Sequence, residues 1–98
     1  MTVPQFNYQD AVVKIITAFH PNAKLYLFGS YARGNQRQGS DIDLAIDAGK
    51  ELTFQEISLL RNLLSALPIA QTIDLVDIHN VQDHFRTEIL SHGALWKS

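Results

Sequence analysis

Two aspartates, Asp41 and Asp43, are separated by one residue in the stretch FGSYARGNQRQGSDIDLAI, residues 28–46. Side chains at i and i+2 of a β-strand lie on the same face, so both carboxylates are expected to point the same way, with α-carbons roughly 6.6 Å apart. Two unit charges about 7 Å apart repel by roughly 2.4 kcal/mol at an effective dielectric constant of 20. A proton on one carboxylate, or a hard cation such as Mg²⁺ between them, would offset this repulsion.

A third carboxylate, Asp74, lies in the later apolar stretch TIDLVDI. If that strand lies beside the first, about 4.8 Å away, the three carboxylates converge. Such a cluster is what metal-assisted phosphoryl transfer requires, with one or two ions bridging phosphate oxygens. The structural alternative is a solvated polar face that protects an edge strand from pairing. Asp77 falls on the face opposite Asp74, and we expect it to be solvated or at most a second-choice ligand.

A glycine and a serine, Gly29 and Ser30, stand where an apolar strand gives way to an expected helical turn. Free backbone N–H groups and the helix dipole at such a point bind anions, and the hydroxyl adds a donor. A nucleoside triphosphate is the natural ligand. Arg33, one turn further, could reach a phosphate oxygen, and Arg37 and Lys24 are weaker candidates for the same role.

Several competing motifs are excluded by the residues present. A P-loop needs Lys followed by Ser or Thr where Asn35 and Gln36 stand. No G-x-G-x-x-G occurs, so a dinucleotide site has no support, and an EF-hand fails at Ala45 and Ile46. The histidines lack the helical pairing of a zinc site, which leaves capping, surface or core roles for them.

Three longer helices are predicted from apolar periodicity and capping residues. Asn7 can cap the first, Thr53 and Glu56 form a capping box that opens the second, and Asn80 can cap the third. The positions expected to face the core are Val12, Ile15, Ile16 and Phe19 in the first helix, Phe54, Ile57, Leu60, Leu63 and Leu64 in the second, and Val81, Phe85, Ile89 and Leu90 in the third. The expected helix ends are at His20-Pro21, Pro68 and Gly93.

Three strands are predicted between these helices, over residues 24–28, 41–46 and 72–78, with a short helical turn over 30–33. The connection from 49 to 71 contains a whole helix, which favours a parallel crossover between the second and third strands. The shorter connection between the first two strands favours an antiparallel pair. The predicted fold class is α/β of the α+β type: a small mixed β-sheet of three to four strands with helices packed on it.

The bulk composition limits the function classes. A chain of 98 residues with 46% hydrophobic residues is expected to form one domain over 1–98. A net charge of −2 gives no basic surplus for long nucleic acids. Cysteine is absent, which excludes disulfides and thiolate chemistry. No leader-like or membrane-spanning stretch stands out, so the expected location is cytoplasmic, with no membrane partner.

The stretch GSYARGNQRQGSDIDLAI resembles the nucleotidyltransferase signature G-S-x-x-x-G followed by a D-x-D strand, found in the DNA polymerase beta superfamily. The later IDL, with Asp74, is similar to the position of that superfamily's third carboxylate. Given its size, the chain resembles the minimal nucleotidyltransferase (MNT) group over nearly its whole length, including the last helix and a G-x-x-W ending.

This resemblance implies a nucleotidyltransferase fold and roles for the residues singled out above. Gly29 and Ser30 would hold the nucleotide phosphates, Asp41 and Asp43 would ligate Mg²⁺, and Asp74 would complete the metal site and prepare an incoming hydroxyl. The implied reaction transfers AMP from ATP to a hydroxyl acceptor. Larger members carry a second domain over the acceptor, and this sequence is expected to lack one.

MNT proteins are typically encoded beside a helical HEPN-type partner, and several pairs act as toxin and antitoxin, so the resemblance implies such a partner and a homo- or hetero-oligomer. Two alternatives stay open from the residues. The chain could be a non-catalytic nucleotide-binding antitoxin that acts by complex formation, or a small-molecule nucleotidyltransferase. The residues do not identify the acceptor or the preferred base.

Overall fold

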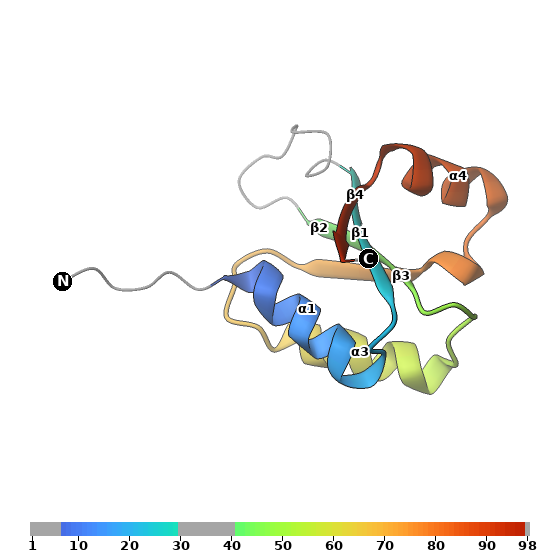
Figure 1. The fold of residues 1–98 in the computed structure, drawn as a ribbon. Coiled ribbons are helices and arrows are strands. Elements are labelled where there is room, and N and C mark those ends of the chain that lie inside the picture. The colour runs from blue at the N-terminus through green and yellow to red at the C-terminus, as the bar shows by residue number, and fades with distance from the viewer. Residues whose placement is uncertain (1–6, 30–40, 98) are drawn as a thin grey trace.

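The computed structural model describes residues 7–29 and 41–97 (Figure 1). Within these residues it contains three longer helices, one short 3-10 helix and four strands. In chain order they are α1 (Tyr8–Phe19), β1 (Lys24–Phe28), β2 (Ile42–Asp47), α3 (Phe54–Ser65), β3 (Ile73–Asp77), the 3-10 helix (Ile78–Asn80), α4 (Asp83–His92) and β4 (Ala94–Lys97).

The strands form one sheet in the order β3-β2-β1-β4. β2 pairs with β3 in parallel and with β1 antiparallel, which confirms both predicted pairings. β4 pairs antiparallel with the other side of β1 and was not predicted as a separate strand. The architecture is therefore a mixed four-stranded sheet with helices packed on it, as the α+β prediction required.

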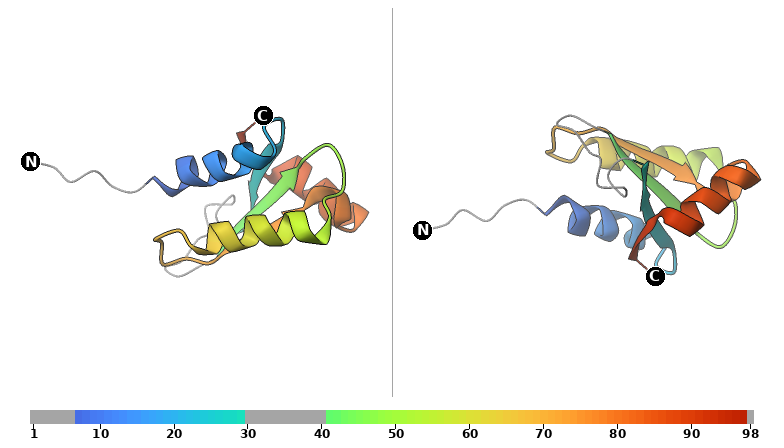
Figure 2. Two further views of the ribbon diagram at one scale, coloured as in Figure 1. Left: turned by 90° about the horizontal axis from the view of Figure 1, so that it is seen from below. Right: turned by 90° about the horizontal axis from the view of Figure 1, so that it is seen from above.

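Helices cover both faces of the sheet (Figures 1 and 2). α1 and α3 lie on one face, where Val12, Ile16 and Leu60 pack with Leu25 and Leu44 of the strands in the larger hydrophobic core. α4 lies on the other face over a smaller cluster centred on Ala45, Ile78 and Ile89, with Phe28 and Phe85 beside them. Because alternate residues of a strand face opposite sides, β2 supplies large aliphatic side chains to the first face and small or acidic ones to the second.

Two of the three predicted helix starts are confirmed. The Asn7 side chain accepts a hydrogen bond from the Asp10 backbone N–H at 3.1 Å. Thr53 and Glu56 form the reciprocal capping box. The third start is wrong: α4 begins after Gln82, and Asn80 belongs to the 3-10 helix, because Asp77 accepts the His79 N–H and closes a tight turn there first.

Some residues predicted to face the core are exposed instead. Phe19 is 48% exposed, Phe54 78% and Leu90 51%. Phe19 is the last residue of α1 and Phe54 is the first of α3, so both stand at helix ends, while Leu90 follows the buried Ile89 on α4. Asp41 lies just before β2 rather than inside it. None of the helices within the described ranges is long and apolar enough to cross a membrane.

Candidate active site

Two aspartates face each other across the parallel strand pair. Asp43 of β2 is the register partner of Asp74 of β3, and on its other side Asp43 is the partner of Phe28 of β1. Paired residues of neighbouring strands project to the same face. The three side chains therefore form one row across the sheet, on the face that carries α4.

Asp41 joins this row electrostatically. The pKa of the Asp43 carboxyl is raised, first by burial, then by the negative charge of Asp74 and then by that of Asp41. Both neighbours thus act on the same carboxyl group. The three predicted acidic residues therefore share one electrostatic site, although they come from two strands and a preceding loop.

Gly29 lies directly after β1 and contacts this site. Its backbone has φ +74°, and a Cβ built on it would collide with the Asp43 carboxylate. Any other residue would be strained here and would displace Asp43. The glycine therefore allows the chain to pass against the carboxylate, in addition to the close phosphate approach predicted from the sequence.

Of the other residues predicted to contact phosphate, only Lys24 lies within the described residues. Ser30, Arg33, Arg37 and the predicted turn over 30–33 lie outside the described residues, so their roles stay predictions. Lys24 is at the opposite end of β1 from Gly29 and pairs in register with Asp47. It therefore lies away from the carboxylate row, and its assignment as a phosphate contact is wrong.

The donor set of the row suits a hard divalent cation, which takes carboxylate and phosphate oxygens. Burial, followed by the charges of Asp74 and Asp41, raises the pKa of Asp43, and a bound cation would offset this by favouring the charged carboxylate. As the side chains lie, however, no group of three histidine or acidic residues in 7–29 and 41–97 is close enough to hold a metal ion. The Asp41 and Asp74 side chains are exposed, so ions in solvent reach both carboxylates.

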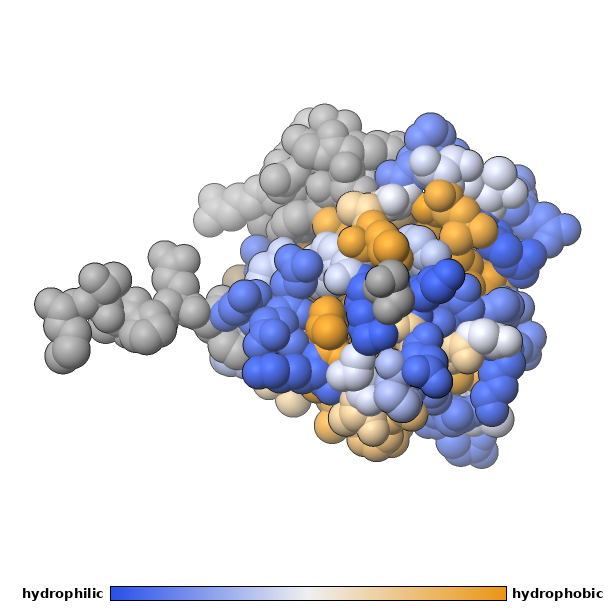
Figure 3. Space-filling view, in the orientation of Figure 1, coloured by the Kyte–Doolittle hydropathy of each residue, from blue (hydrophilic) through white to orange (hydrophobic). Residues whose placement is uncertain are grey.

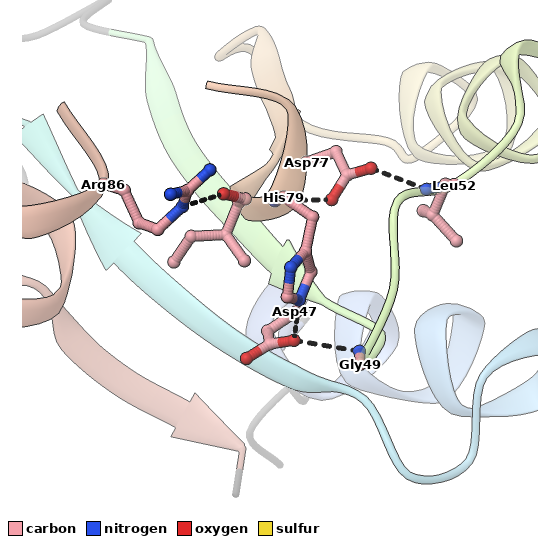
Figure 4. Close-up of polar contacts among 7 residues, drawn as sticks. Asp47, Gly49, Leu52, Asp77, His79 and Arg86 are labelled. Atoms are coloured by element: carbon pink, nitrogen blue, oxygen red, sulfur yellow. Dashed lines mark hydrogen bonds and ion pairs between the residues drawn. The ribbon is translucent and has the colours of Figure 1, made fainter. Parts of the chain in front are cut away.

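Asp77 is not solvated, and the prediction that it was a surface group or second-choice ligand is wrong. It is 7% exposed, and its carboxylate accepts hydrogen bonds from the backbone N–H groups of Leu52 at 2.7 Å and His79 at 3.0 Å (Figure 4). It ties the loop before α3 to the end of β3. Its role is structural.

Asp47, at the same end of the sheet, has a partner that sequence reasoning missed. Its carboxylate lies 2.6 Å from His79 Nε2 and accepts the Gly49 N–H at 2.9 Å (Figure 4). Burial alone would raise the pKa of Asp47, but the Gly49 and His79 contacts outweigh it and lower the pKa. The D-x-G spacing of an Asx turn was a usable signal for the first contact. No sequence pattern near Asp47 indicated its contact with His79, which lies 32 residues later.

The family described as polymerase beta, nucleotidyltransferase matches residues 13–98. The chain is 33% identical over 91 residues to the protein adenylyltransferase MntA of Shewanella oneidensis, covering 90% of this chain and 64% of the relative. It thus spans less than two thirds of that relative.

Two solved structures share the fold. A crystal structure of a toxin–antitoxin with AMP-PNP superposes with a TM-score of 0.77 at 27% identity, covering 90% of this chain and 71% of that one. A mutant of the toxin–antitoxin MntA–HpeT superposes with a TM-score of 0.75 at 28% identity, covering 93% and 72%.

Proposed function

The chain belongs to the polymerase beta nucleotidyltransferase family, in its minimal nucleotidyltransferase group, and from this premise we propose that it transfers AMP from ATP to a hydroxyl group. The proposed acceptor is on a helical HEPN-type protein, which this chain would neutralise as the antitoxin of a toxin–antitoxin pair. Residues 1–98 would supply one minimal nucleotidyltransferase domain, and the partner would supply the wall over the acceptor.

One observation carries the proposal: Asp43 and Asp74 are register partners, and the charges of Asp74 and Asp41 both raise the pKa of Asp43. A partly buried carboxyl group held beside two further acidic residues is hard to explain as structure, because no hydrogen bond from the described residues to the Asp43 carboxylate offsets its burial and the neighbouring charges. The three carboxylates are readily explained as ligands. Asp41, Asp43 and Asp74 would hold one or two Mg²⁺ ions, and Mg²⁺ when bound neutralises negative charge on the triphosphate.

The other residues have positioning roles in this proposal. Gly29 and Ser30 would hold the β- and γ-phosphates, with Arg33 at a phosphate oxygen. The acceptor hydroxyl oxygen would form a bond to the α-phosphorus, the bond from that phosphorus to the α–β bridging oxygen would break, and pyrophosphate would leave. The hydroxyl proton would pass to the Asp74 carboxylate. Catalysis of this type depends on positioning and charge stabilisation.

The nucleotide and the partner are supported by the similar proteins. One relative is named a protein adenylyltransferase, and one structural neighbour is described as a toxin–antitoxin with AMP-PNP. An adenine nucleotide and a protein acceptor are the direct extension of those descriptions to this chain.

The experiment is to incubate the chain with ATP, Mg²⁺ and the product of the neighbouring gene, and to weigh both proteins. We expect the partner to gain the mass of one or more AMP units. The double variant Asp41→Asn with Asp43→Asn should abolish the gain, whereas Asp47→Asn, on the same strand outside the row, should retain it. Undiminished transfer by the double variant would refute the assignment.

The residues leave one alternative function open: a non-catalytic antitoxin that binds the partner and a nucleotide without turnover. This function predicts a stable complex that the double variant still forms, with no mass gain under any nucleoside triphosphate. The same mass measurement, combined with size-exclusion chromatography of the mixture, separates the two functions.

A further inference from the structure

A groove, here called the β3-edge groove, lies along the outer edge of β3, between α3 and the 3-10 helix. β3 ends the sheet on one side, and Figure 2 shows β3 and α3 at the border of the molecule opposite β4. The groove has a volume of about 380 Å³ and contains none of the three carboxylates of the row. Its lining includes Glu51, Phe54, Ile57, Arg61, Val76 and Asn80.

The rim of the β3-edge groove carries an exposed aromatic ring. Phe54 is 78% exposed, more than any other large apolar residue among those described. It is the first residue of α3, whose start is already capped by Thr53 and Glu56, so the ring is not needed to begin the helix. Aromatic residues and arginine are enriched at protein interfaces and contribute much of their binding energy. An exposed phenylalanine beside a cavity is therefore typical of a surface that a partner protein covers.

Arg61 lines the same groove and is held in a fixed position. Its Nε and Nη2 both donate to the Leu75 carbonyl oxygen, at 3.0 and 2.9 Å. The other N–H groups of the guanidinium meet no hydrogen-bond acceptor among the described residues. A fixed guanidinium with unused N–H groups binds carboxylates well. The groove therefore combines apolar walls, from Ile57 and Val76, with a site for one acidic side chain.

The two acidic residues in the lining leave the Arg61 end of the groove open for a carboxylate. Asp77 is buried, and its carboxylate already accepts two backbone N–H groups. Glu51 precedes α3, whereas Arg61 comes seven residues after Phe54, about 10.5 Å along the helix axis. An acidic group of an occupant is therefore favoured at Arg61 and disfavoured at the Glu51 end.

The β3-edge groove ends close to the carboxylate row. Val76, in its lining, lies two residues after Asp74 on the same face of β3, about 6.6 Å away. Leu75, whose carbonyl holds Arg61, follows Asp74 directly. A protein seated in the groove would therefore lie next to Asp74, the carboxylate that receives the hydroxyl proton in the proposed mechanism.

The outer edge of β3 favours a helix over a strand as the occupant. Ile42 N–H donates to the Thr72 oxygen, so β3 turns the backbone groups of alternate residues from Thr72 on toward β2, and those of Leu75 outward. An added strand would need the outward Leu75 oxygen as an acceptor, and Arg61 already occupies it. A helix satisfies its own backbone groups and needs only a groove for its side chains.

We propose that the β3-edge groove is the docking site for a helix of the protein that carries the acceptor hydroxyl. This helix places an apolar side chain beside Phe54 and Val76, and a carboxylate at Arg61. The inference rests on the proposed transfer to a helical partner and names the surface that holds this partner. Phe54 and Arg61 are docking residues, and neither contacts the nucleotide in this arrangement.

The test measures the affinity of the chain for the product of the neighbouring gene by isothermal titration calorimetry, without nucleotide. Phe54→Ser should weaken the complex by about tenfold or more, the effect of truncating an aromatic residue at the centre of an interface. The melting temperature of the free variant should not fall, because the ring is largely exposed.

Two control variants replace exposed apolar residues outside the groove. Leu59, 43% exposed, lies on α3 as Phe54 does, but lines a different cavity with Phe19. Leu90, 51% exposed, lies on α4, on the side of the molecule where apolar residues gather in the space-filling view (Figure 3). Leu59→Ser and Leu90→Ser should each retain the affinity of the unaltered protein. They separate loss of docking from general loss of apolar surface.

Variants of Arg61 test the predicted carboxylate contact. Arg61→Gln keeps an N–H donor for the Leu75 oxygen but removes the positive charge, and it should weaken the complex by about fivefold. Its affinity should also depend less on salt concentration than that of the unaltered protein, since one ion pair is lost. Arg61→Lys keeps the charge and should bind with an affinity between the two.

Two further measurements identify the occupant and the step affected. A photo-reactive benzophenone amino acid in place of Phe54 should cross-link to a helix of the neighbouring gene's product. With ATP and Mg²⁺, Phe54→Ser should raise the KM for that protein about tenfold and change kcat by less than about twofold, because docking and not the reacting geometry is altered.

The outcomes separate this inference from the proposed function. Unchanged affinity of Phe54→Ser, or equal weakening by Leu59→Ser, overturns the docking site, and the function stands if the partner still gains mass. If Phe54→Ser alone weakens a complex in which no partner gains mass, the groove still binds the helix and the function fails. Cross-linking to a second copy of this chain, or no complex of the unaltered protein with the neighbouring gene's product, overturns the docking site.

Discussion

The two ends of the β2–β3 pair carry the same residue type in opposite situations. At the amino end, Asp43 and Asp74 are register partners, with Asp41 beside them, and none of their carboxylates accepts a hydrogen bond from the described residues. At the carboxyl end, Asp47 and Asp77 accept four hydrogen bonds between them, from Gly49, Leu52 and His79. Asp47 and Asp77 are stabilised by hydrogen bonds, whereas burial and two acidic neighbours disfavour the charged form of Asp43.

This contrast indicates which carboxylates belong to function. A protein gains stability from a buried carboxylate that accepts backbone N–H groups, and loses stability where carboxylates repel one another. Carboxylates that stay close together despite their repulsion are better explained as ligands of a cation than as structural groups. Burial alone would have selected the wrong residue, because Asp77 is the most buried aspartate among those described.

The largest expected effect is at the amino end. Asp43→Asn should lower AMP transfer by about a thousandfold or more, since it removes a metal carboxylate from a reaction that depends on charge stabilisation. The variant should fold at least as stably as the unaltered protein, because a repulsive charge is lost. Mass spectrometry of the partner and thermal unfolding measure the two effects. Reduced stability together with retained transfer would reverse the assignment.

A substitution at the carboxyl end should have the opposite effect, on stability and not on transfer. Asp77→Asn should lower the free energy of unfolding by about 2–4 kcal/mol, because one of two backbone N–H groups loses its buried acceptor. Transfer per folded molecule should be retained. Asp74→Asn, three residues earlier on the same strand, is the control and should not destabilise. Urea unfolding curves measure this difference, and equal stability of the two variants would remove the contrast between the ends.

Cation binding should have a smaller effect, an increase in the free energy of unfolding. Mg²⁺ at ten times its dissociation constant should raise the free energy of unfolding by about 1.4 kcal/mol if it binds only the folded state. The double variant Asp41→Asn with Asp43→Asn should show no increase, whereas Asp77→Asn should show the full one. Thermal shifts across a Mg²⁺ titration measure this. The same increase in the double variant would place the cation elsewhere.

The smallest effect is the pH dependence, and its sign differs between the ends. The pKa of Asp43 is raised, so between the usual and the raised pKa the folded state binds more protons, and its contribution to stability is lost as pH rises through the folded pKa. The pKa of Asp47 is lowered, so its contribution is present above the usual pKa and is lost as pH falls through the folded pKa.

Single variants at Asp43 and Asp47 make the sign of each pH dependence of stability measurable. Relative to the unaltered protein, Asp43→Asn should gain most in stability above the raised pKa, and Asp47→Asn should lose most above the usual pKa. Unfolding free energies measured across the acidic range check both curves. Two curves of the same sign would show that the ends do not differ electrostatically in the way described.

The sequence was sufficient where local chemistry determines local structure. The Asn7 cap and the Thr53–Glu56 capping box need only neighbouring residues, and both are confirmed. The D-x-D spacing and the crossover length were likewise enough to place Asp43 beside Asp74. These features depend on period and connection length, which are visible in one sequence.

Other features depend on contacts distant in the sequence. Asp77 is buried because the loop carrying Leu52 passes over it, 25 residues earlier in the chain. β4 is only four residues long and exists because β1 offers it a free edge. His79 reaches Asp47 from a 3-10 helix that displaced the predicted cap at Asn80. No pattern within one segment reports such partners.

The most direct measurement of the central claim is paramagnetic broadening by Mn²⁺ in the presence of ATP. If the amino-end carboxylates share one cation, the amide signals of Asp41, Asp43 and Asp74 should broaden first, with that of Phe28 close behind, while Asp47 and Asp77 stay sharp at the same Mn²⁺ concentration. Broadening centred on Asp47 and Asp77, or uniform across the sheet, would contradict the account.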